Sequence, residues 1–133
     1  MIEIKSSHDL KRLRRLALSS QGLLKANTFG SGVNGASNAI KHLGYVQIDT
    51  ISVVERAHHH VLQSRVSSFK PEMLNPLLVN GDVFEYWSHA AAFLPMEDFR
   101  FSLPYKEAIK SGQTHWYKEP DKKLMAELLG RVR

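Results

Sequence analysis

The sequence predicts a predominantly α-helical domain with a small β-hairpin, the α+β arrangement of a winged helix-turn-helix. Two observations carry this prediction: helical periodicity in the first half of the chain, and a turn followed by two β-prone runs in the second half. The expected element order is helix, helix, strand, helix, hairpin. With 133 residues, of which 43% are hydrophobic, the chain is long enough to form one domain with a core.

The first predicted helix begins at Ser6 or Ser7, either of which can cap it, and Asp9 suits the positive end of the helix dipole. At about 100° per residue, apolar side chains share one arc, which we expect to be buried. These residues are Leu10, Leu13, Leu16 and Ala17. Cationic side chains occupy the opposite arc and form either a phosphate-binding face or a merely solvated one. They are Lys11, Arg12, Arg14 and Arg15.

The glycine spacing of residues 29–35 predicts a loop, and a second helix is expected from Asn34 to Leu43, with Gly44 as its C-terminal stop. Tyr45–Asp49 then reads as a short strand.

Pro71 suits the first turn of another helix, which should run to about Leu78. The turn residues 80–82 precede two β-prone runs, Val83–Trp87 and Ala91–Leu94, which predict the hairpin wing.

Near the end of the chain, Pro120 and Asp121 should start a helix whose apolar stripe has little remaining sequence to pack against. The stripe consists of Leu124, Met125, Leu128 and Val132. We therefore expect residues 1–115 to form a winged-helix domain and residues 116–133 to be the truncated start of a following one.

The bulk composition limits the possible functions. The formal charge of +5 suits a polyanionic partner, and the absence of cysteine excludes disulfides, thiolate nucleophiles and cysteine-ligated zinc. Because neither a signal peptide nor an apolar run of membrane-spanning length is found, we expect a cytoplasmic protein that does not interact with membranes.

Gln47-Ile48-Asp49 is the triplet with the most chemical potential. In a strand, Gln47 and Asp49 would share one face while Ile48 points to the core. A carboxylate can take a proton from water or stabilise a cation, and an amide can hold the same water. An alternating edge strand produces the same pattern without any function.

The histidine run 58–60 does not predict a metal site, because consecutive helical residues point about 100° apart and no HExxH pattern is present. Helix packing or phosphate contact are the better interpretations. Arg56 and Arg65 flank the run and could follow a phosphate backbone, although ordinary surface charge is the alternative. Ser52, Ser64 and His89 form no hydrolase triad that the pattern reveals.

Residues 43–65, LGYVQIDTISVVERAHHHVLQSR, resemble the AlkZ/YcaQ family of bacterial DNA glycosylases. FEYWSH at 84–89 and FLP at 93–95 look like a second block of that family. Its longer members are built from tandem winged-helix domains that form a concave DNA-binding surface.

The resemblance implies that Gln47 and Asp49 are catalytic, because the family motif is glutamine, an aliphatic residue, then glutamine or aspartate. An aspartate at the third position points to the YcaQ-like branch, which excises N7-alkylguanine and unhooks guanine-N7 interstrand crosslinks. It further implies monofunctional chemistry without a metal or organic cofactor, and double-stranded DNA as partner. The sequence does not determine the oligomeric state, for which we expect a monomer. The hairpin would either reach toward the lesion or serve the fold.

The residues that we expect to contact DNA are basic or histidine side chains. They are Arg12, Arg14, Arg15, Lys41, Arg56, His58, His59, Arg65 and His89.

Two alternatives remain open. The chain could be a non-catalytic winged-helix DNA-binding or regulatory module, in which Asn38, Lys41 and His42 of the second helix would read bases. It could also be a structural domain whose basic face only solvates it.

Overall fold

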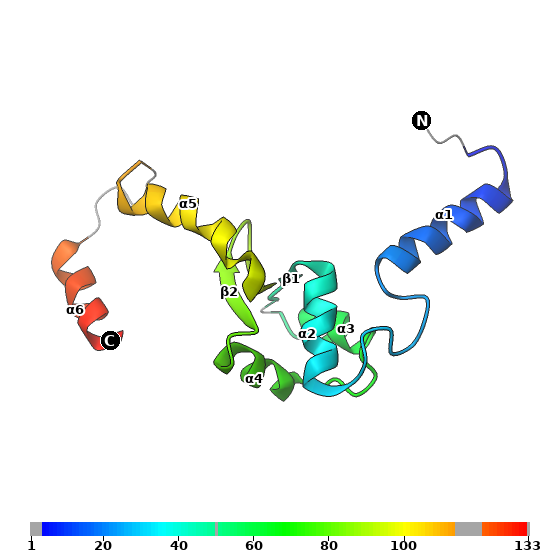
Figure 1. The fold of residues 1–133 in the computed structure, drawn as a ribbon, viewed down its shortest axis with the longest axis horizontal. Helices are drawn as coiled ribbons and strands as arrows, with labels where there is room; N and C mark the ends of the chain where they lie inside the picture. Colours follow the sequence, from blue (N-terminus) through cyan, green and yellow to red (C-terminus); the bar gives the residue numbers. More distant parts are fainter. Residues whose placement is uncertain (1–3, 50, 114–120, 133) are drawn as a thin grey trace. The chain divides into compact units, whose positions relative to one another are not determined.

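The computed structural model describes residues 4–49, 51–113 and 121–132. The chain divides into two compact units, Met1–Phe99 and Arg100–Arg133. The predicted fold class is confirmed, because the structure is mainly helical and has a small antiparallel sheet with short helices beside it, a winged-helix-like α+β fold (Figure 1).

The first unit contains helices α1, α2, α3 and α4, together with two short 3₁₀ turns. Their bounds are Ser7–Ser20 for α1, Gly32–Leu43 for α2, Ala57–Gln63 for α3 and Leu74–Val79 for α4, with 3₁₀ turns at Pro71–Met73 and Met96–Asp98. Pro71 opens the first of these turns, as the sequence predicts. The predicted helix from Pro71 to Leu78 is therefore a 3₁₀ turn that continues into α4.

The sheet has three strands in the order β1-β3-β2, with both pairings antiparallel. The strands are Val46–Gln47 (β1), Val83–Trp87 (β2) and Ala91–Pro95 (β3). Strands β2 and β3 form the predicted hairpin, within a residue of the expected bounds. The prediction for β1 is too long, because the strand ends at Gln47 and the backbone from Ile48 to Asp49 leaves the ladder after one further hydrogen bond, from Ile48 N–H to the Ala91 carbonyl.

The core lies between α2, α3, α4 and the sheet. Its fully buried members include Ile40 of α2, Leu62 of α3, Leu77 of α4 and Val46 of β1. Phe93 of β3 closes the core from the sheet side. This packing fixes β1 and the start of α3 against the hairpin, and these are the segments that carry the candidate site.

Helix α2 ends as predicted and begins earlier than predicted. Gly44 takes a left-handed conformation, with φ of 69°, and its N–H closes on the Ile40 carbonyl at 2.8 Å. The expected loop 29–35 becomes helical at Gly32, where the Ser68 hydroxyl accepts from the Gly32 amide. Gly35 faces the Gly30 backbone so closely that an added Cβ would lie 2.8 Å from the Gly30 carbonyl carbon.

The expectation that α1 buries an apolar stripe is wrong. Ser6 caps the helix by accepting from the Asp9 amide, as predicted, but α1 has no buried residue. Leu13 and Leu16 remain 40% and 63% exposed and line an open hollow with Ile4 and Leu24. Amphipathic spacing specifies which residues share a face, but a tertiary partner must cover that face before it becomes core.

The second unit contains most of α5, Phe99–Lys110, and α6, Lys122–Val132. Helix α5 was not predicted, and it continues through Pro104. Helix α6 was predicted, although the proposed first residue, Pro120, lies outside the described residues. Its apolar stripe is solvent-exposed, with Leu128 at 47%. The boundary predicted at residue 115 and the identity of a following domain stay predictions. No helix among the described residues is long and apolar enough to span a membrane.

Candidate active site

Strand β1 presents Gln47 on the surface. Val46 pairs with Phe93 and is buried, whereas Gln47 pairs with Ala92 and is exposed. Ile48 is half-buried and packs against the core, as the alternation of a strand predicts. Gln47 is thus anchored by its two neighbours in the chain while its amide faces solvent.

Asp49 is positioned by hydrogen bonds outside the sheet ladder. Its backbone N–H donates to Nδ1 of His58 at 3.1 Å, and its Oδ1 accepts from the Ile51 N–H at 2.8 Å. The second contact closes a turn in which a carboxylate mimics a backbone acceptor. Asp49 is half-buried. Its backbone is therefore fixed from α3, and one oxygen of its carboxylate from the segment that follows.

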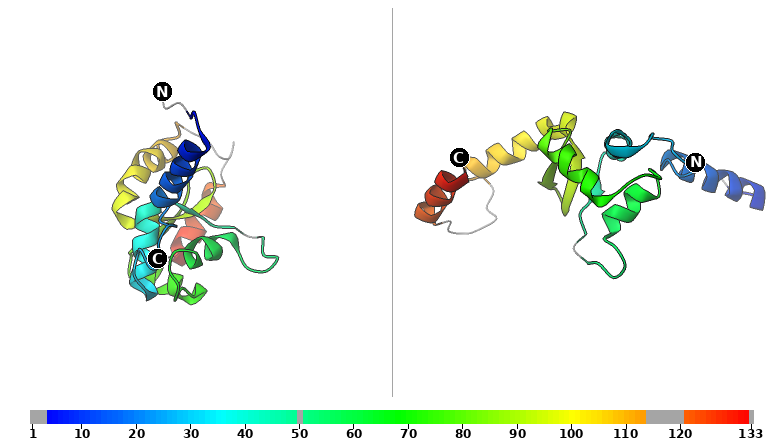
Figure 2. Two further views of the ribbon diagram at one scale, coloured as in Figure 1. Left: turned by 90° about the vertical axis from the view of Figure 1, so that its right-hand side faces the viewer. Right: turned by 90° about the horizontal axis from the view of Figure 1, so that it is seen from below.

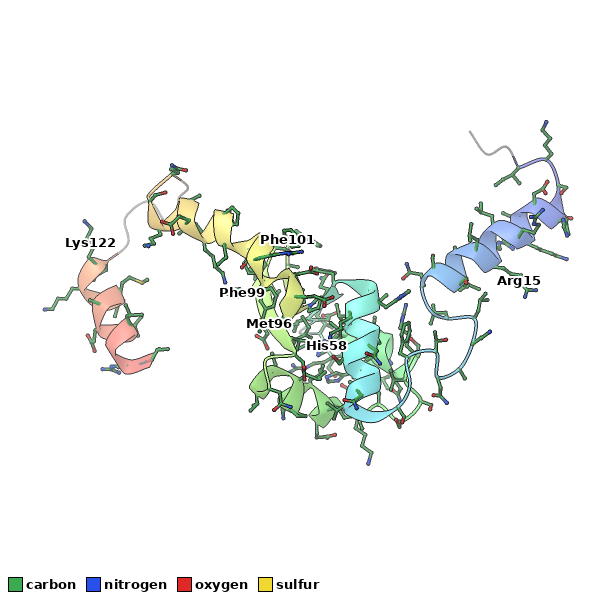
Figure 3. The ribbon with its side chains drawn as sticks, viewed as in Figure 1. Arg15, His58, Met96, Phe99, Phe101 and Lys122 are labelled. Carbon is green, nitrogen blue, oxygen red and sulfur yellow. The ribbon has the colours of Figure 1, made fainter. Side chains whose placement is uncertain are left out.

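His58, in the first turn of α3, is buried in the core with 3% of its surface exposed (Figure 3). Its ring lies edge-on to Phe93 and to the ring of His59. Burial is the main cause that lowers the pKa of His58, with the neighbouring His59 as the second. Because Nδ1 accepts from Asp49, the neutral ring carries its proton on Nε2.

Gln47 has a second neighbour group on the surface of the sheet. The Tyr45 hydroxyl donates to Gln47 Oε1 across a long 3.5 Å and lies 3.1 Å from Nε2 of His89. The Tyr45 and His89 rings stack with centroids 5.0 Å apart. The loop of the hairpin thereby brings His89 to the strand that bears Gln47. A separation of 44 residues left no sequence signal for this contact.

Glu55 organises the entry into α3. Its Oε1 accepts from the Arg56 amide at 2.8 Å and lies 2.9 Å from Nδ1 of His59. The Arg56 amide, and then His59, lower the pKa of Glu55. The His59 side chain is 13% exposed and also contacts Phe69, so it is largely covered.

Arg65 acts as a structural tie. It is 8% exposed, its Nε donates to the Gln21 carbonyl at 2.9 Å, and its Nη1 donates to the Val61 carbonyl at 2.8 Å. His42 of α2 makes a parallel contact, from Nε2 to the Ser20 carbonyl. Both side chains bind the end of α1, where helix carbonyls are unsatisfied.

The remaining predicted DNA contacts are exposed side chains on helices α1 and α2, in the segment before α3 and in the hairpin loop. They are Arg12, Arg14 and Arg15 of α1, Lys41 of α2, Arg56 before α3, and His89. The fold brings His89 to Gln47, and brings His58 to Asp49. In contrast, His58 and Arg65 are directed inward, and His58 serves the site through the Asp49 amide.

A family model described as DNA glycosylase AlkZ-like matches residues 40–133, which is more than half of the chain. The chain belongs to the AlkZ-like DNA glycosylase family. The match begins inside α2 and includes every residue of the site around Gln47 and Asp49. No solved structure matches the chain.

Membership in the AlkZ-like family gives the protein a general role, which is DNA glycosylase activity in DNA repair, with DNA as the partner. Among residues 4–49, 51–113 and 121–132, no group of three or more histidine, aspartate and glutamate side chains could hold a metal ion. The polar groups of the site are an amide, a carboxylate, a phenol and imidazoles.

Proposed function

We propose that this member of the AlkZ-like family hydrolyses the N-glycosidic bond of N7-alkylguanine, with Gln47 and Asp49 as its catalytic residues. The triplet Gln47-Ile48-Asp49 supports its inclusion in the aspartate-bearing, YcaQ-like branch as part of this proposal. The observation that carries the proposal is the way Asp49 is held, by His58 through its amide and by Ile51 through its carboxylate. Because the backbone of Asp49 and one oxygen of its carboxylate are both held, the other oxygen has a defined position from which to act on the substrate.

The chemistry follows from the leaving group. Alkylation at N7 makes the guanine cationic, so the bond from C1′ to N9 breaks with its electron pair going to the base and little acid catalysis is needed. The sugar then develops oxocarbenium character, which the Asp49 carboxylate stabilises. Gln47 holds the water that adds to C1′, and Asp49 takes its proton. A positioned group of this kind contributes about 10²–10³ in rate, without a metal or cofactor.

The exposed cations supply the duplex contacts in this proposal. Arg12, Arg14, Arg15, Lys41 and Arg56 bind phosphates through charge, which supports affinity without reading sequence. His89 is exposed beside Gln47 and is the histidine that we assign to the DNA side. His58 and Arg65 are left out of this set because both are buried and bind backbone groups. His59 is left out as well, because its side chain is 13% exposed and contacts Glu55.

A guanine crosslinked through N7 cannot leave its duplex freely, because it is bonded to the opposite strand. An enzyme that unhooks such a lesion must reach C1′ from a groove rather than draw the base into a closed pocket. Gln47 is exposed on a sheet surface, which suits this mode of access. We therefore include guanine-N7 interstrand crosslinks in the proposed substrate class.

Asp49→Asn tests the catalytic assignment in the full chain. The amide keeps the size of the side chain and an oxygen for the Ile51 amide, but it cannot stabilise the cationic sugar or accept a proton. We expect excision from N7-methylguanine DNA to fall by about 10² or more, with DNA binding nearly unchanged. Glu72→Gln, which changes an exposed carboxylate at the start of the 3₁₀ turn before α4, is the matched control. Retained excision in Asp49→Asn would remove Asp49 from the mechanism.

The regulatory alternative is less well supported. A base-reading helix α2 would need free polar side chains, but Asn38 donates to the Phe29 carbonyl and His42 to the Ser20 carbonyl. Lys41 is then the remaining candidate of the three, and a lysine alone reads phosphate charge better than base identity.

A further inference from the structure

Residues 51–56, which lead into α3, expose three aliphatic side chains beside the candidate site. Ile51 is 73% exposed, Val53 91% and Val54 88%. Figure 2 shows in both views that residues 51–56 extend away from α2, α3 and the sheet. Aliphatic side chains held this far from the core of their own domain are available to an apolar partner.

The segment is a built turn. Ser52 and Arg56 form an antiparallel bridge, which sets Val53, Val54 and Glu55 at the tip. Glu55 folds back, since its carboxylate accepts from the Arg56 amide and contacts His59. The acidic side chain is thereby engaged at the base of the turn, and the two valines remain as its outward groups.

The same turn is joined directly to the proposed catalytic carboxylate. The Ile51 amide donates to Asp49 Oδ1, so a displacement of the turn changes the position of that oxygen. Arg56, at the base of the turn, is an exposed cation. An apolar tip above a cationic base matches a DNA duplex, which presents phosphates on its outside and an apolar base stack within.

Resting on the proposed function, we propose that Val53 and Val54 form a wedge that enters the groove beside the lesion and separates stacked bases. Arg56 then meets the adjacent phosphate, and Ile51 transmits the seated position of the turn to Asp49. Partial unstacking opens the path to C1′ without full extrusion of the base. A crosslinked guanine needs such a route, because it cannot leave the duplex. The occupant of this apolar surface is thus the damaged duplex.

The test uses the full chain and a duplex in which 2-aminopurine, whose fluorescence rises on unstacking, adjoins a 2′-fluoro-stabilised N7-methylguanine. We expect the natural sequence to raise the fluorescence and Val53→Ser/Val54→Ser to remove most of the rise. Affinity for the lesion duplex should fall by about tenfold for each valine that no longer enters an apolar site. Excision from unmodified N7-methylguanine DNA should fall with it.

Val79→Ser is the matched control, because Val79 is also 85% exposed but lies at the end of α4. It should leave both readouts unchanged, and thermal unfolding should not shift in any of these exposed variants. Unaltered fluorescence and excision in Val53→Ser/Val54→Ser would overturn the wedge. Excision by the natural sequence without any rise in fluorescence would also overturn it. If the only effect of the two substitutions were loss of a dimer, the valines would instead bind a second copy of the chain, and the wedge would be overturned as well.

Asp49→Asn separates the wedge from the proposed function. If that variant raises the fluorescence but does not excise, wedge and chemistry are both supported as distinct steps. If it excises normally while the fluorescence still depends on the two valines, the catalytic assignment fails and the wedge stands.

Discussion

His58→Leu removes the acceptor that holds the Asp49 backbone, while it keeps an apolar side chain of similar size in the core. The hydrogen bond that disappears is the 3.1 Å bond from the Asp49 N–H to Nδ1. A partly buried amide without a partner costs about 1–3 kcal/mol in folding stability. Release of the Asp49 backbone also misplaces the carboxylate, for which a displacement of about 1 Å costs on the order of 10² in rate.

His58→Asn is the informative companion variant, because its Oδ1 can accept near the place of Nδ1. We expect it to recover most of the excision rate that is absent in His58→Leu. His60→Leu, at an exposed position of the same helix, controls for the removal of an imidazole in general.

The pH dependence has a defined sign. The pKa of His58 is lowered in the folded chain, mainly by burial. The neutral ring is thus favoured by folding, and its contribution to stability is fully present above the unfolded pKa of about 6.5. As the pH falls from about 6.5 toward the depressed folded pKa, the unfolded state binds the proton first, and stability declines by up to about 1.4 kcal/mol per pH unit.

Excision should fall at the acidic end of this range, around the depressed pKa of the folded protein, because a protonated His58 cannot accept from the Asp49 amide. Single-turnover excision and urea unfolding, each measured from about pH 5 to pH 8, provide the check on the natural sequence, His58→Leu and His58→Asn. Asparagine should flatten the acidic decline in stability. The reasoning is refuted if His58→Leu retains the natural excision rate, or if the acidic decline is identical in His58→Asn.

Three further predictions concern the rest of the fold and the cationic surface. Gly35→Ala should destabilise the first unit by about 1–3 kcal/mol, because its Cβ would meet the Gly30 backbone, whereas Gly130→Ala, with open space around it, should be neutral or slightly stabilising in thermal unfolding. Arg65→Met should cost about 1–3 kcal/mol and raise hydrogen exchange at the end of α1, since the Gln21 and Val61 carbonyls lose their donors; unchanged exchange would contradict its role as a tie. Arg14→Ala/Arg15→Ala should weaken DNA binding for all sequences and reduce the slope of log affinity against log salt by about 0.9 for each phosphate that the protein no longer neutralises. Arg131→Ala, at a residue paired with Glu127, is the control for this variant. An unaltered slope for the α1 variant would mean that the cationic face of α1 does not bind DNA.

The amino-acid sequence by itself determined the local features, because short-range chemistry specifies them. The Ser6 cap, the Gly44 stop and the hairpin after residues 80–82 depend on neighbouring residues, and each was predictable from residue type and spacing. The triplet that carries Gln47 and Asp49 was also visible as a pattern. Only its resemblance to a family gave that pattern a chemical meaning.

The tertiary structure decided which of these side chains face solvent and which hold others in place. Periodicity predicted a buried stripe on α1, but burial needs a partner surface, and Leu13 and Leu16 have none that covers them within the described residues. The histidine run could have bound phosphate. Instead, packing of α3 against Phe93 buries His58 and directs its Nδ1 to the Asp49 amide, a contact set by three-dimensional packing, which no sequence spacing encodes.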